Sequence, residues 1–165
     1  MGRSARVPKP IHVACIGLAL ILSSNTLVNA TSAKRSVRKL TDIVGNLKKE
    51  LEIPNTVDIR IVEHNRLAVS VEPADHHGDF LLLVDTHFLD RLDDEELTAA
   101  LAHELGHVWI YTHHPFLHTE ALANKIAMRV VARDGLRKLY TKLWDFKGEA
   151  GDLVAVLGID PRNLQ

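Results

Sequence analysis

The sequence predicts a single α+β domain, and three observations point to that class. Residues 32–51 place apolar side chains every three or four positions, which is typical of an amphipathic helix. Residues 57–61 and 67–71 alternate apolar with polar side chains, and residues 80–84 are continuously apolar, which predicts a small twisted sheet of about three strands. From residue 92 onward the apolar spacing is helical again.

Turn and capping residues indicate how these elements are connected. The turn at residues 64–66 predicts that 57–61 and 67–71 pair with each other as a two-stranded hairpin. Asp93, followed three positions later by Glu96, forms a capping box, which is typical of the first turn of a helix. A long helix is therefore expected to begin just after Asp93.

The C-terminal part is predicted to be helical. After a loop over residues 113–118, a helix is expected from Thr119 to Arg133, closed by Gly135. Residues 136–157 continue as a helical segment with an interruption near residues 148–151. No internal repeat or linker divides the chain, so one domain is expected.

The composition excludes several classes of protein. The 165 residues are 46% hydrophobic and 25% charged, which is ordinary for a globular core and excludes a disordered or collagen-like chain. The formal net charge is −1, so nucleic acid is not an expected partner. Histidine is unusually frequent, with ten residues in the chain, and most of them lie between His76 and His118.

Residues 1–30 have the three-part plan of a secretory signal peptide: a basic start, an apolar run from Val13 to Leu22 and a polar end at Val28-Asn29-Ala30. Cleavage after Ala30 would leave residues 31–165 as one domain. The apolar run is shorter than the roughly twenty residues of a spanning helix. We therefore expect a secreted or periplasmic protein. The alternative is membrane association through an uncleaved leader.

The only cysteine, Cys15, lies in the leader, so no disulfide is expected in the mature domain. A domain of this size must then be held together by its core, and a bound metal would add to its stability.

The residues most informative about function form the motif His103-Glu104-Leu105-Gly106-His107 within the predicted long helix. A spacing of four residues places both imidazoles on one helix face, where they can bind one Zn²⁺ ion. Glu104 is one residue further round the helix, so it can reach a water at the metal without binding the metal itself. That is the position of a general base.

A catalytic zinc ion needs a third protein ligand, and Glu120 is the best candidate because a short loop would bring its helix back against the first. One of the loop histidines, His113, His114 or His118, is the alternative ligand; otherwise these three are expected to be solvated. Asn124, one turn beyond Glu120, can support a ligating histidine through its outer nitrogen. An aspartate there would be expected to hold zinc more tightly.

Three other residues near the motif carry weaker expectations. Gly106 is expected to allow close packing of the helix against the sheet. Trp109 and Trp144 are expected in the core rather than at the substrate. Tyr140 is a candidate donor to an oxyanion.

The run Leu92-Asp93-Asp94-Glu95-Glu96-Leu97, followed by the motif helix and then by Glu120, resembles the gluzincin zinc metallopeptidases. Within that class it is similar to the M48 family and to the minigluzincins, over about Phe80–Val131. The runner-up is the ImmA/IrrE-type peptidases, because Asn124 stands where M48 enzymes carry aspartate.

The resemblance implies a zincin-like fold with bound Zn²⁺, in which Phe80–Val84 is the sheet edge that pairs with extended peptide. It also implies hydrolysis of peptide bonds, and the leader suggests that the substrates are exported or envelope proteins. The alternative function is a non-catalytic or self-blocked zinc-binding domain that regulates or binds another protein.

Overall fold

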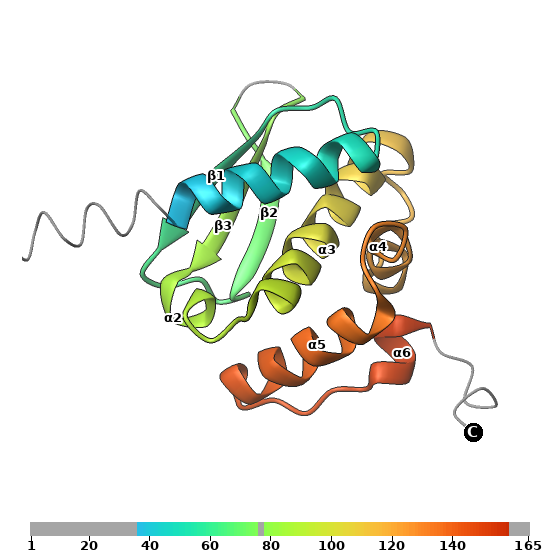
Figure 1. The fold of residues 1–165 in the computed structure, drawn as a ribbon. Coiled ribbons are helices and arrows are strands. Elements are labelled where there is room, and N and C mark those ends of the chain that lie inside the picture. The colour runs from blue at the N-terminus through green and yellow to red at the C-terminus, as the bar shows by residue number, and fades with distance from the viewer. Residues whose placement is uncertain (1–35, 76–77, 159–165) are drawn as a thin grey trace, which may run out of the picture. The chain divides into compact units, whose positions relative to one another are not determined.

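The computed structural model of the chain describes residues 36–75 and 78–158. The predicted leader lies outside the described residues. The elements in chain order are a helix over residues 36–50, β1 (Val57–Val62), β2 (Val69–Pro73), β3 (Phe80–Asp85), α2 (Thr86–Leu89), α3 (Asp94–His113), α4 (Glu120–Ala127), α5 (Arg133–Lys147) and α6 (Leu153–Leu157) (Figure 1). The predicted α+β class is confirmed. No helix among these residues is long and apolar enough to span a membrane.

The three strands form one mixed sheet in the order β1-β3-β2. β1 runs parallel to β3, and β2 runs antiparallel to it. The predicted hairpin between residues 57–61 and 67–71 is therefore wrong, because β3 lies between these two strands. β3 is the most apolar strand, with four of its six residues buried, and it gains most from the central position.

The same strand order overturns the expectation that Phe80–Val84 is the sheet edge. These residues belong to β3, and the edges of the sheet are β1 and β2. The apolar side chains Leu40, Val44 and Leu47 of the N-terminal helix belong to the same buried core as β3.

Helix α3 is the central element of the domain. It begins with the predicted capping box: Asp93 accepts the Glu96 N–H, and the Glu96 carboxylate accepts the Asp93 N–H. Thirteen of its twenty residues are buried, which is typical of a helix surrounded by other elements. It packs against β2, α4 and α5, and residues of all four elements line one cleft.

Helix α4 is shorter than the sequence predicts. It ends at Ala127, and residues 128–131 form turns before α5 begins at Arg133. Gly135 therefore does not close α4. It lies in the first turn of α5, where its Cα faces the side chain of Glu95 on α3. The predicted interruption near residues 148–151 is confirmed, since Gly148 ends α5 in the left-handed conformation (φ 66°) before α6.

Candidate metal centre

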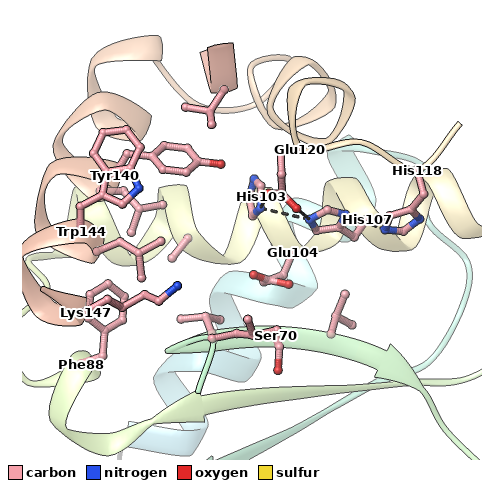
Figure 2. Close-up of a pocket in the computed structure, with 17 residues that line it drawn as sticks. Ser70, Phe88, His103, Glu104, His107, His118, Glu120, Tyr140, Trp144 and Lys147 are labelled. Atoms are coloured by element: carbon pink, nitrogen blue, oxygen red, sulfur yellow. Dashed lines mark hydrogen bonds and ion pairs between the residues drawn. The ribbon is translucent and has the colours of Figure 1, made fainter. Parts of the chain in front are cut away.

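One face of α3 carries the motif histidines. Four residues of this face line one cleft: Ala100, His103, Glu104 and His107. Residues three or four positions apart in a helix are neighbours on its surface, which is why these side chains lie together. Both histidines are buried, and their Nε2 atoms lie 3.1 Å apart. The two rings lie next to each other with their planes perpendicular, and Figure 2 shows the Glu104 carboxylate between them and β2.

Glu120, the first residue of α4, completes a group of three. Its carboxylate oxygens lie 3.1 Å from Nε2 of His103 and 3.6 Å from Nε2 of His107. Donors around a tetrahedral ion at about 2.1 Å stand about 3.4 Å from one another, and the three distances here are close to that value. The side chains therefore fit a metal ion, and among the described residues they form a candidate metal group.

Gly106 explains why α4 can come so close. A Cβ atom there would lie 2.4 Å from the carbonyl oxygen of Ala123, far inside van der Waals contact. Gly106 thus packs against the backbone of α4, and the expectation that it packs against the sheet is wrong. Because Ala123 lies one turn after Glu120, this close approach places the carboxylate beside the histidines.

Asn124 is completely buried and makes three hydrogen bonds. Its Oδ1 atom lies 2.8 Å from Nδ1 of His103 and accepts that N–H. In the neutral ring this bond keeps the proton on Nδ1 and leaves Nε2 unprotonated, as metal binding requires. When the ring is protonated on both nitrogens, the Nε2–H faces Glu120. The Nδ2 amide donates to the Tyr140 hydroxyl at 2.8 Å and to the Val156 carbonyl at 2.7 Å.

His118 contacts His107, which the sequence analysis did not expect. Its Nε2 atom lies 2.9 Å from Nδ1 of His107, so each of the two motif histidines has a partner on its outer nitrogen. His118 is otherwise exposed, as are His113 and His114. Glu120, not His118, is the residue that lies at the metal-facing Nε2 atoms. The only signal in the sequence was the place of His118 two residues before Glu120.

The charges at the site are set by burial and by these contacts. Hydrogen bonds from His103 and then from His107 hold the pKa of Glu120 well below its ordinary value, which keeps the carboxylate ionised. Burial is the largest effect on Glu104 and raises its pKa, against the opposing effect of the two histidines. Burial lowers the pKa of His103, but the Glu120 hydrogen bond and the Glu104 charge outweigh it, so the net pKa is raised.

The cleft beside this group has a volume of about 460 Å³. Its far wall is one stripe of α5 that includes Tyr140, Leu143 and Trp144, and Phe88 of α2 adds to the apolar lining. Trp144 packs against the core, as expected from the sequence, and it also lines the cleft. Lys147, at the end of the same stripe, is paired with Glu149.

The near wall is the edge strand β2. The residues that flank β2 continue its pairing: the Ala68 carbonyl accepts the Asp85 N–H of β3, and the Ala74 N–H donates to Asp79, just before β3. In an antiparallel ladder every second residue bonds to the partner strand, so residues 70 and 72 also face β3.

The backbone groups of Val69 and Val71 then point away from β3, to the edge where the structure as described has no further strand. The Val69 N–H donates to the Leu67 carbonyl at 2.8 Å, so the carbonyls of Val69 and Val71 are the groups that a further strand could use there. The Val71 N–H is close enough to Glu104 to lower the pKa of its carboxyl group.

Fold and site together define a zincin-like α+β domain with a group of two histidines and one glutamate that fits a metal ion. No protein-family model matches the chain, and no curated protein matches its sequence. A solved structure similar to it is the metallopeptidase zymogen of Pyrococcus abyssi abylysin, with a TM-score of 0.50 and 18% sequence identity. The match covers 68% of this chain and 99% of that chain, and it establishes the fold.

Proposed function

We propose that this protein is a zinc metallopeptidase of the gluzincin type. The observation that carries the proposal is the joint placement of His103, His107 and Glu120 with a buried Glu104 beside the edge strand β2. The abylysin likeness supports it, since that protein is a metallopeptidase zymogen. Two neutral imidazoles and one carboxylate are a donor set typical of catalytic zinc.

A zinc ion bound there would polarise the scissile carbonyl and acidify the attacking water. Glu104 is then the general base: its carboxylate takes a proton from the water and later passes it to the leaving nitrogen. Its raised pKa suits both steps, because a carboxyl group with a pKa nearer neutrality both accepts and returns a proton readily. Glu120 has the opposite shift and remains a charged ligand.

The substrate would be an extended peptide that adds to the edge of β2, with its N–H groups donating to the backbone carbonyls of Val69 and Val71. The stripe of α5 with Leu143 and Trp144 faces that position across the cleft. It favours a large apolar side chain next to the scissile bond. Exported or envelope proteins remain our proposed substrates on the sequence of residues 1–30.

In this proposed reaction, the Tyr140 hydroxyl donates a hydrogen bond to the developing oxyanion. Its hydroxyl oxygen accepts the Asn124 amide, so its own proton is free to be donated toward the cleft. Burial strongly raises the pKa of this hydroxyl, which keeps it protonated.

The test is the Glu104→Gln variant. We expect it to retain one zinc ion per chain by metal analysis, and to lose cleavage of an unfolded protein such as casein, followed by mass spectrometry. Glu63→Gln, on an exposed turn, is the matched control and should cleave like the parent. Cleavage by Glu104→Gln at the parent rate would exclude Glu104 as the base. A zinc-loaded parent that cleaves nothing would favour a non-catalytic binding domain.

A further inference from the structure

The surroundings of Asn124 require one acceptor and one donor at a single side chain, with a third contact that either can make. His103 presents an N–H, the Val156 carbonyl presents a lone pair, and the Tyr140 hydroxyl can act either way. An asparagine amide supplies this combination, because Oδ1 accepts and Nδ2 donates twice. All three contacts are buried or partly buried, so an unmade bond there would not be replaced freely by water.

The Val156 carbonyl decides which way the amide points. A carbonyl can only accept, so the atom 2.7 Å from it must be Nδ2, and Oδ1 is then the atom that faces His103. With the amide turned over, Nδ2 would face His103 and would require an unprotonated Nδ1. The proton would move to Nε2, where it blocks metal binding. The contact with Tyr140 does not determine the orientation of the Asn124 amide, because a hydroxyl can either accept or donate a hydrogen bond.

Val156 belongs to α6, which is short and held by few contacts. Asp152 caps its first turn through the N–H groups of Val154 and Ala155. Leu157 is the one residue of α6 buried in the core, and the helix packs on α4 and α5. The element that orients Asn124 therefore lies more than thirty residues beyond it in sequence.

We infer that α6 supports the metal centre indirectly. Its Val156 carbonyl orients the Asn124 amide, and Asn124 in turn orients the His103 ring for metal binding. The inference rests on the metal site of the proposed function, although not on peptidase activity. It accounts for asparagine at this position, because an aspartate would place a carboxylate oxygen against the Val156 carbonyl oxygen. Asn124→Asp should therefore weaken zinc binding, which reverses the expectation from sequence alone.

Coupling of this kind is reciprocal. If the docking of α6 raises the affinity of the site for zinc, then bound zinc must raise the equilibrium constant for docking of α6 by the same factor. Removing zinc should then speed hydrogen exchange at the amides of α6 more than at those of β3, and exchange can be followed by mass spectrometry on the full chain.

Three variants test the inference by calorimetric zinc titration and hydrogen exchange. Asn124→Asp breaks the bond to Val156 directly, and Asp152→Ala removes the cap of α6 without touching the site. Each should bind zinc about 10-fold or more weakly and should exchange faster in α6. Ala155→Ser, on the exposed face of the same helix, is the matched control and should behave like the parent.

The outcomes separate this inference from the proposed function. A parent that binds no stoichiometric zinc would overturn the metal centre itself. A parent that binds zinc while α6 exchanges at the same rate with and without it would overturn only the coupling. Asn124→Asp binding zinc as tightly as the parent, with α6 still protected, would also overturn it. Circular dichroism of each variant shows whether the rest of the fold is retained.

Discussion

The Cα of Gly106 on α3 lies so close to the backbone of Ala123 on α4 that a methyl group there would stand 2.4 Å from the Ala123 carbonyl oxygen. The atom in the way belongs to the backbone of a helix, which cannot move aside as a flexible side chain can. The separation of α3 and α4, and with it the reach of Glu120 to the two histidines, depends on the missing side chain.

Gly106→Ala should therefore push α4 away. We expect a loss of about 1 to 3 kcal/mol in the free energy of unfolding, and weaker zinc binding because Glu120 moves from His103. Gly45→Ala is the control: it also lies inside a helix but has nothing within 4 Å of its Cβ position. It should stabilise the protein by about 0.5 to 1 kcal/mol. Thermal unfolding and zinc titration measure both effects, and equal behaviour of the two variants would contradict the close-packing argument.

His118→Ala removes the partner of Nδ1 on His107. The freed ring can rotate and change tautomer, so zinc affinity should fall by about 10 to 100-fold, with little effect on the melting temperature of the metal-free protein. His114→Ala alters an exposed histidine of the same loop and should leave affinity unchanged. If both variants bind zinc like the parent, the contact between His118 and His107 does not support the metal.

Zinc should stabilise the fold, because its three proposed ligands come from two helices. At 100 times the dissociation constant, an ion that binds only the native state adds about 2.7 kcal/mol. Chelation should then lower the melting temperature of the parent. Glu120→Gln, with one ligand altered, should melt close to the chelated parent with or without chelator. An unchanged parent melt after confirmed metal loss would show that the site contributes little to stability.

The buried carboxylate of Asp85, which lies outside the metal group, should make the stability of the protein depend on pH. It is 1% exposed and accepts backbone N–H groups of Asn65, His87 and Phe88. Burial acts to raise its pKa, but these hydrogen bonds outweigh it and the net pKa lies below the ordinary value. The ionised carboxylate therefore contributes stability above its unfolded pKa of about 3.9, and this contribution is lost as the pH falls through the lower folded pKa.

Asp85→Asn should accordingly destabilise the protein by about 1 to 2 kcal/mol at pH 7, with a smaller difference from the parent at pH 3. Asp58→Asn, on an exposed position of β1, should show neither effect. Urea unfolding at the two pH values measures the difference. A penalty for Asp85→Asn that is equal at both would mean that its charge does not matter.

Much of the local structure could be predicted because its causes lie within a few residues. The capping box of Asp93 and Glu96 satisfies the first turn of α3 with neighbouring groups, and the four-residue spacing of His103 and His107 places both rings on one face wherever that helix lies. The interruption at Gly148 is equally local, since the left-handed conformation there favours glycine.

The sequence by itself determined the α+β class and brought His103, Glu104 and His107 onto one helix face. Only the tertiary structure decided the strand order, the early end of α4, the contact of His118 with His107 and the orientation of Asn124. Alternating apolar residues indicate that a strand is buried on one face, but they carry no information about which strand lies beside it. The continuously apolar residues of β3 are consistent with its central position, but the strands on either side of it were not predictable from the pattern. The orientation of Asn124 likewise depends on a carbonyl group thirty-two residues away, and every residue carries such a group, so only the packing of α6 selects this one.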